Sequence, residues 1–372
     1  MNIALRTGAV ASAAALTMLL AACTPSNEVE ETSSAAAGAS ETAEVVELSG
    51  NLAGAGASSQ ESAMEAWRAG FQAINPDVTV SYDPVGSGGG RTQFLDGAVA
   101  FAGSDSLMDE EEYALAVDRC GADGAIHLPT YISPIAVIFN LEGIESLNMD
   151  ADTIALIFDG KITNWSDPAI AALNEGVALP DLAITMVHRA DESGTTSNFT
   201  DYLAKASTQW PYEKSGEWPN ALGESGPGTS AVVQIVQDTN GAVGYADASR
   251  AGELGTVALK VGEEFVPFSA EAAAAVVDAS PLAEGANGEN DLAFKLDRTT
   301  TASGAYPLVL VSYHIVCQSY EDENERALVT GFLSYVASEE GQATSASAAG
   351  SSPISADLSA RILEILDGIA NA

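Results

Sequence analysis

Short loops of glycine and hydroxyl-bearing residues join predicted strands to predicted helices at three places, and these junctions constrain the fold of this chain most. The clearest junction is 188–196, with the sequence His-Arg-Ala-Asp-Glu-Ser-Gly-Thr-Thr. It follows the alternating apolar run 182–187, which is typical of a strand, and precedes 198–205, where aromatic and aliphatic residues recur at helical spacing. A strand, a polar loop and a helix in this order indicate an α/β protein.

The 188–196 loop carries the groups that bind an anion. The first turn of a helix presents unpaired backbone N–H groups and the positive end of the helix dipole. Hydroxyl groups, a glycine that permits close approach and a planar cation complete the set: Ser193, Thr195, Thr196, Gly194 and Arg189. The loop therefore predicts an anion site, and an ordinary helix cap with a surface arginine is the alternative.

Two similar junctions lie nearer the N-terminus. A predicted strand runs into the small-residue turn 53–59, and Ser58 and Glu61 have the spacing of a capping box at the start of the next helix. A second strand leads to the glycine-rich loop 85–91, and the short strand 100–105 ends on a serine and an aspartate. Ligands of open α/β sheets bind at the carboxyl ends of strands, so we expect these loops to lie together.

Two long apolar segments, 126–139 and 306–316, are predicted strands that would suit crossings between two domains. About 350 residues follow the predicted leader, which is too many for one small core and enough for two domains.

Residues 1–22 have the pattern of a secretory signal, in which Arg6 precedes an apolar run too short to span a membrane. The run ends in Leu-Ala-Ala followed by Cys23, and it resembles a bacterial lipobox, whose cysteine is diacylated and becomes the new N-terminus. Residues 23–47 are rich in Ser, Ala, Thr and Glu and lack aromatic side chains, which predicts a lipid-anchored flexible tether.

The formal net charge of −38 excludes nucleic acid as a partner, because the chain has no basic surface that could neutralise a phosphate backbone. A small anion remains compatible with this charge. Surface charges are screened beyond roughly 8 Å at physiological salt, so the donors inside a cleft decide what binds there.

The two remaining cysteines, Cys120 and Cys317, predict a disulfide in an exported protein. Two separately buried thiols are the alternative.

Four motifs occur in a fixed order along the chain: Gly-Ala-Gly-Ala-Ser at 54–58, Gly-Ser-Gly-Gly-Gly at 86–90, Ala-Gly-Ser-Asp at 102–105 and Arg-Ala-Asp-Glu-Ser-Gly-Thr at 189–195. The segments 161–165 and 241–245 support them. With these motifs, the chain resembles the phosphate-binding lipoprotein of the bacterial high-affinity ABC phosphate transporter, from about Leu52 to the C-terminus.

This resemblance implies an α/β, two-lobed periplasmic-binding-protein-like fold with crossing strands as the hinge. Lobe I would comprise 48–130 plus 303–372, and lobe II would comprise 131–302. The protein would be a monomer on the extracytoplasmic face of the membrane. It would capture one inorganic phosphate between its lobes, without a cofactor, and deliver it to the membrane permease of the importer.

Carried over residue by residue, the resemblance implies a phosphate site made of eight residues: Ser58, Ser59 through its backbone, Ser87, Asp105, Arg189, Ser193, Gly194 and Thr195. Asp105 would accept a proton from the ligand, and Asp191 would hold Arg189 in place. Two departures bear on the site. Ser58-Ser59-Gln60 stands where the family often has Thr-Phe-Pro, and Glu192 adds a negative charge where a glycine is common.

Several alternatives stay open at this point. His188, Asp191 and Ser193 are the residue types of a catalytic triad, but they lie within one loop and no nucleophile elbow is present. The three histidines lack metal-ligand spacing, so no metal site is expected. The remaining alternatives are a protein that binds another oxyanion, such as sulfate, molybdate or tungstate, and a structural lipoprotein whose glycine turns are only turns. For Asp105 alone, the alternative is that it caps a helix beginning near Asp109 and does not touch a ligand.

Overall fold

The computed structural model describes residues 47–285 and 287–371, and contacts join Glu47–Ala372 into one compact unit. The predicted signal 1–22, Cys23 and the tether up to residue 46 lie outside the described residues.

An 11-stranded sheet organises the described chain, with eight strands in the order β2-β1-β3-β13-β4-β8-β6-β7. Their bounds are β1 Gly50–Gly56, β2 Val78–Asp83, β3 Phe101–Ser104, β4 Ala125–Phe139, β6 Thr185–Arg189, β7 Glu224–Gly226, β8 Ala242–Asp247 and β13 Val309–Cys317. The other three strands, β5 Ser146–Met149, β9 Gly255–Val261 and β10 Glu264–Val266, join through β9, which pairs with the end of β4. Four short strands form separate pairs: β11 Leu282–Gly285 with β12 Gly288–Phe294, and β14 Ser319–Tyr320 with β15 Ala370–Asn371.

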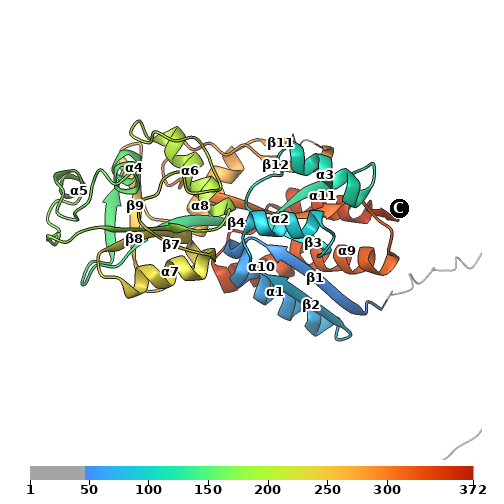
Figure 1. Ribbon diagram of the computed structural model, residues 1–372. Helices are drawn as coiled ribbons and strands as arrows, with labels where there is room; N and C mark the ends of the chain where they lie inside the picture. The colour runs from blue at the N-terminus through green and yellow to red at the C-terminus, as the bar shows by residue number, and fades with distance from the viewer. Residues whose placement is uncertain (1–46, 286, 372) are drawn as a thin grey trace, which may run out of the picture. The chain divides into compact units, whose positions relative to one another are not determined.

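Strand β4 connects the two parts of the sheet. Its first ten residues run antiparallel to β13, from the pair Ala125 and Cys317 to the pair Pro134 and Val309. From Ile135 onward it pairs with β8 instead. In Figure 1, β1, β2 and β3 lie on one side of β4, and β7, β8 and β9 lie on the other. The apolar segment 126–139 therefore crosses between the two parts of the sheet, whereas β13 pairs with β3 and the first part of β4. Both strands are buried along their whole length.

Eleven α-helices lie in the described residues: α1 Glu61–Ile74, α2 Ser87–Leu95, α3 Glu110–Cys120, α4 Ala151–Phe158, α5 Pro168–Leu173, α6 Gly194–Ala206, α7 Gly228–Asp238, α8 Ala270–Ala279, α9 Glu323–Ala337, α10 Glu339–Ala349 and α11 Ala356–Asp367. Two 3-10 turns, η1 Ser58–Gln60 and η2 Ala248–Arg250, accompany them. Many helices begin where an Asp or Ser side chain accepts a hydrogen bond from the first turn: Asp109, Asp150, Asp167, Ser193, Ser269, Asp322, Ser338 and Ser355. No helix in the described ranges is apolar over enough residues to cross a bilayer.

Buried tryptophans join helices and loops that are distant in the sequence. The indole N–H of Trp67 on α1 donates to the carbonyl of Gly341 on α10 at 2.7 Å, and that of Trp165 donates to the carbonyl of Gly241 at 2.9 Å. The second bond places the segment 161–165 against 241–245.

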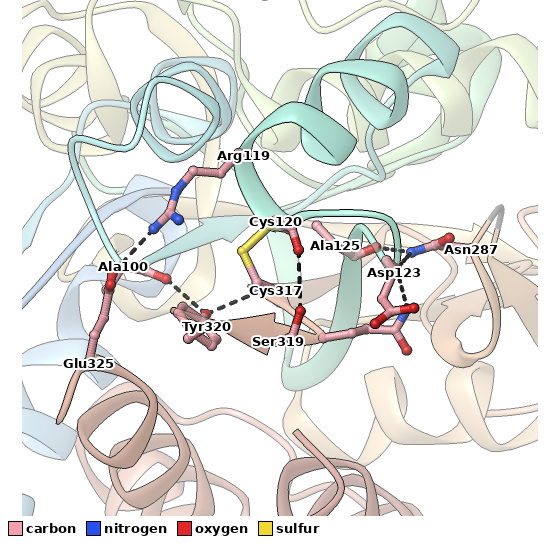
Figure 2. Close-up of a disulfide and its surroundings, with 11 residues drawn as sticks. Ala100, Arg119, Cys120, Asp123, Ala125, Asn287, Cys317, Ser319, Tyr320 and Glu325 are labelled. Carbon is pink, nitrogen blue, oxygen red and sulfur yellow. Dashed lines mark hydrogen bonds and ion pairs between the residues drawn. A yellow bond between two sulfur atoms is a disulfide. The ribbon is translucent and has the colours of Figure 1, made fainter. Parts of the chain in front are cut away.

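Cys120, the last residue of α3, forms a disulfide with Cys317, the last residue of β13 (Figure 2). The predicted disulfide is therefore present. Polar contacts surround it: the Tyr320 hydroxyl donates to the carbonyl of Ala100 at 3.1 Å and accepts from the backbone N–H of Cys317 at 3.1 Å.

Candidate functional site

The predicted loops meet because parallel strands end at the same edge of a sheet. Strands β1 and β3 are parallel and pair Gly56 with Gly103, so the turn after β1 and Asp105 after β3 emerge side by side. Strands β6 and β7 are parallel too and pair Arg189 with Gly226. The ends of these two strand pairs face each other, as the hydrogen bonds below show.

Asp105 lies at the centre of this meeting point and is 4% exposed. Its Oδ1 accepts hydrogen bonds from the hydroxyls of Ser59 at 2.6 Å and Ser312 at 2.5 Å. Its Oδ2 accepts from the hydroxyl of Thr195 at 2.9 Å, and its backbone N–H donates to Ser87 Oγ at 3.1 Å. Burial raises the pKa of Asp105 above its ordinary value, although the three hydroxyls and the charge of Arg189 partly oppose this rise.

The first turn of α6 lies directly against Asp105. The hydroxyl of Ser193 caps the helix by accepting from the backbone N–H of Thr196 at 3.2 Å. A Cβ atom on Gly194 would lie 2.6 Å from both Asp105 Cβ and Ser87 Oγ, so only glycine permits this approach. The start of α6, with its backbone donors, is therefore held against the carboxylate.

Arg189, at the end of β6, is 3% exposed, and its guanidinium forms a two-pronged ion pair with Asp191. The backbone N–H of Gly228 also donates to Asp191, at 3.0 Å. Burial would raise the pKa of Asp191, but the hydrogen bonds and charge of Arg189 outweigh it and hold that pKa below its ordinary value. Gly86, at φ 90°, lies so close that a Cβ there would overlap Asp191 Oδ2. The Arg189–Asp191 pair thus lies against the turn before α2.

Ser58 does not form the expected capping box with Glu61, and that prediction is wrong. Residues 58–60 form a 3-10 turn, and α1 begins at Glu61 without a side-chain cap. The Ser58 hydroxyl instead lies 3.0 Å from the hydroxyl of Thr229 and accepts from the backbone N–H of Thr229 at 3.0 Å. The distant partner outcompetes the local one because both Ser58 and Thr229 are buried at the junction.

Glu192 has a cationic partner that the sequence does not indicate. The guanidinium of Arg91 on α2 lies 3.2 Å from Glu192 Oε2 and 2.8 Å from Glu112 Oε1. Arg91 also donates to the hydroxyls of Ser104 at 3.1 Å and Ser106 at 2.9 Å. Arg91 is therefore shared between Glu112 and Glu192, and it offsets part of the extra negative charge next to the site.

Sequence reasoning missed three residues of this cluster: Ser312, Thr229 and Arg91. Ser312 lies in an apolar strand, and a β-bulge between it and Tyr313 shifts the register beside Asp105. Gln60 donates to the Ser312 hydroxyl at 2.6 Å, so the unusual residue at position 60 supports the group that bonds Asp105. A lone serine in the apolar run 307–316 was the available signal for Ser312; Arg91 and Thr229 offered none beyond their places after glycines.

The enzyme alternative finds no support in the geometry. His188 Nδ1 lies 2.8 Å from the carbonyl of Arg189, and its ring stacks on Trp218 with centroids 4.9 Å apart. Ser193 is occupied as a helix cap. Within the described ranges, no group of three or more His, Cys, Asp or Glu residues could hold a metal ion. The helix after Asp105 is capped by Asp109, which excludes the capping role for Asp105.

Comparison with known proteins identifies the family. The sequence profile of the PBP superfamily domain matches residues 31–340. Phosphate-binding protein PstS 3 of Mycobacterium leprae (strain TN) is 37% identical over 292 residues, which cover 76% of this chain and 77% of that protein. Phosphate-binding protein PstS2 of Mycobacterium bovis (strain BCG / Pasteur 1173P2) is 35% identical over 343 residues, covering 88% and 90%. This chain belongs to the PstS family of phosphate-binding proteins. The family consists of solute-binding transport proteins and not of enzymes.

Solved structures agree on the fold. A high-affinity periplasmic phosphate-binding protein (PfluDING), whose structure contains phosphate, matches with a TM-score of 0.68 and 18% identity over 87% of this chain and 100% of its own. The phosphate-binding protein of Stenotrophomonas maltophilia matches with a TM-score of 0.65 and 20% identity, covering 85% and 93%. The two-lobed periplasmic-binding-protein-like fold expected for this PstS family member is confirmed.

Proposed function

We propose that this protein captures inorganic phosphate between two lobes and delivers it to the membrane permease of an ABC importer. One observation carries the proposal. The buried carboxylate of Asp105 lies among hydroxyl donors, against the N-terminus of α6 and within electrostatic reach of Arg189.

The surrounding groups supply what a phosphate oxygen needs. Hydroxyl and backbone N–H donors come from both sides of the junction, and Arg189 supplies a charged fork that matches an oxyanion. We assign the ligand shell to the residues that the family resemblance implied: Ser58, Ser59, Ser87, Asp105, Arg189, Ser193, Gly194 and Thr195, with Asp191 holding Arg189. Apart from Gly194 and the supporting Asp191, each residue of this set is at most 4% exposed.

Asp105 gives the site its preference for phosphate. A carboxylate repels a fully ionised anion, and burial strengthens this repulsion. Phosphate near neutral pH keeps at least one acidic hydrogen, which Asp105 accepts in a short charge-assisted hydrogen bond. Sulfate, molybdate and tungstate carry no such hydrogen at that pH.

Because the site is buried, the ligand needs a route in, and we assign it to hinge motion of the lobes. We place lobe I at 48–130 plus 303–372 and lobe II at 131–302. The change of partner in β4, from β13 to β8 after Pro134, supports this division.

We assign the location of the protein from its N-terminal sequence. The pattern of residues 1–22 and Cys23 supports export and diacylation, which would tether a monomer to the extracytoplasmic face of the cell membrane.

Equilibrium binding tests the proposal. The chain from Glu47 onward, which forms one compact unit, is titrated with phosphate and separately with sulfate in a calorimeter. We expect one phosphate per chain and much weaker sulfate binding. Release of phosphate from an ester, or tighter sulfate than phosphate binding, would contradict the proposal.

A further inference from the structure

The lysines of this acidic chain are gathered in one region. The sequence has 52 acidic residues and 14 basic ones, of which five are lysines. Four of the five lysines line two cavities that share Lys205 and Arg298. The fifth, Lys161, forms an ion pair with Asp159 at 2.7 Å and lines neither cavity.

The larger of the two cavities adjoins the phosphate site. Its volume is about 360 Å³, and Asp105 and Asn198 form part of its wall. Asn198 donates to the carbonyls of Asp105 at 2.8 Å and Gly194 at 2.9 Å, so it separates the cavity from the first turn of α6. The cavity therefore directly adjoins Asp105, one of the residues assigned to the ligand.

The charges in this cavity do not cancel. Its cationic lining residues are Lys205, Lys214, Lys295 and Arg298. Its acidic lining residues are Asp105 and Asp201, and Asp201 already pairs with Lys205 at 2.8 Å and Arg298 at 3.0 Å. Within the described part of the chain, neither Lys214 nor Lys295 has a carboxylate oxygen within 4.0 Å of its ammonium. The cavity thus holds two positive charges without an ion-pair partner.

We propose that this cavity is an anion vestibule, a transient subsite that collects the phosphate anion before it reaches Asp105. The inference rests on the proposed function, because it names the route by which the same ligand arrives. A net charge of −38 repels phosphate at long range, but screening limits that repulsion to roughly 8 Å at physiological salt. A cleft lined by positive charge then raises the local concentration of the anion and its association rate.

Lys214 and Lys295 approach the cavity from different parts of the chain. Lys214 lies in the loop that follows α6, and Lys295 follows β12 directly. Both side chains are exposed to solvent. Ammonium groups without a fixed ion-pair partner are suited to brief contacts. Arg298 differs, because its guanidinium is buried and bonded to Asp201, Asn198 and the carbonyls of Pro307 and Val309.

Association kinetics test the vestibule. The chain from Glu47 onward is mixed with phosphate in a stopped-flow fluorimeter. Tryptophan fluorescence is the signal, because Trp218 stacks on His188, the residue before Arg189. The variants are Lys214→Gln, Lys295→Gln and the double variant, and Lys161→Gln is the control with the same charge change per residue. We expect the double variant to associate about three- to tenfold more slowly at low ionic strength, with an unchanged dissociation rate and a weaker salt dependence. Lys161→Gln should associate like the wild type.

Three results would overturn the vestibule. Equal association rates in the wild type and the double variant would remove its role. An equal loss of association rate in Lys161→Gln and the double variant would also overturn it, because that would indicate a general charge effect. If the double variant dissociates faster and its association rate is unchanged, the lysines contact phosphate in its final binding site and not on the way to it. If the wild type binds no phosphate, the proposed function itself fails. If it binds phosphate but the lysine substitutions leave the association rate unchanged, only the vestibule fails.

Discussion

Thr195 donates a hydrogen bond of 2.9 Å from its hydroxyl to Asp105 Oδ2, which joins the first turn of α6 to the end of β3. The two residues are 90 positions apart and both are buried. A ligand at the start of α6 would therefore meet a carboxylate and a hydroxyl that already face each other. We expect the protonation state of the ligand to decide how tightly it binds there.

Asp105→Asn should abolish the discrimination against sulfate. The amide offers a donor where the carboxylate offers only acceptors, so sulfate affinity should rise while phosphate affinity falls modestly. Competitive titration of both anions at neutral pH measures the change. Asp83→Asn, at the exposed end of β2, is the matched control. A variant that still rejects sulfate as strongly as the wild type would show that another residue discriminates.

Arg189→Ala should weaken phosphate binding by orders of magnitude. The arginine is buried, and its loss leaves a desolvated anion without its charged partner, at a cost of roughly 2–5 kcal/mol in binding. Calorimetry gives the dissociation constant, and Arg361→Ala, at a partly exposed position on α11, is the control. An unchanged dissociation constant would remove Arg189 from the ligand shell.

The Cys120–Cys317 disulfide should stabilise the fold substantially, because it joins residues 197 positions apart. Replacing both cysteines by alanine should lower the free energy of unfolding by roughly 2–5 kcal/mol. Urea denaturation of the wild type, the variant and the reduced wild type measures this. Coincident curves for the oxidised and reduced wild type would contradict the prediction.

Asp247 should make stability depend on pH. Burial raises the pKa of Asp247 to about 6 in the folded protein, above the value of about 3.9 in an unfolded chain. The folded state therefore holds this proton more tightly. Its contribution is complete below about pH 4 and is lost as the pH rises through 6.

Asp247→Asn should remove this dependence. Between pH 4 and 8, the difference in unfolding free energy should shift by on the order of 2–3 kcal/mol in favour of the variant. Urea denaturation across this range tests it, with the exposed Asp77→Asn as control. A constant difference between variant and wild type would refute the pH effect assigned to Asp247.

Local patterns in the sequence predicted the junctions, the crossing strand β4 and the family, because glycines, hydroxyls and apolar runs act on their immediate neighbours. The capping-box spacing of Ser58 and Glu61 gave a wrong prediction, because the Ser58 hydroxyl forms a hydrogen bond with the distant Thr229 instead. Arg91 and Glu192 are 101 positions apart, so their ion pair depends on how two distant loops meet. Ser312 donates to Asp105 next to a β-bulge, and no residue at that position predicts a bulge from the sequence. The lysines of the vestibule are likewise dispersed along the sequence, and only the fold brings them together.

The disulfide has a mechanical consequence for the crossing strand β4. It lies at the end of the β4–β13 ladder where Ala125 pairs with Cys317 (Figure 2). At the opposite end, beyond Pro134, β4 changes partners. The β4–β13 ladder is thus covalently fixed at one end by the disulfide, and at the other end β4 continues without β13. If the lobes move as proposed, we expect β4 to bend beyond Pro134, so that β6, β7 and β8 move relative to β1, β2 and β3. In that case we expect the tightness of ligand binding to depend on the few residues of β4 near Pro134, at the opposite end of the ladder from the disulfide.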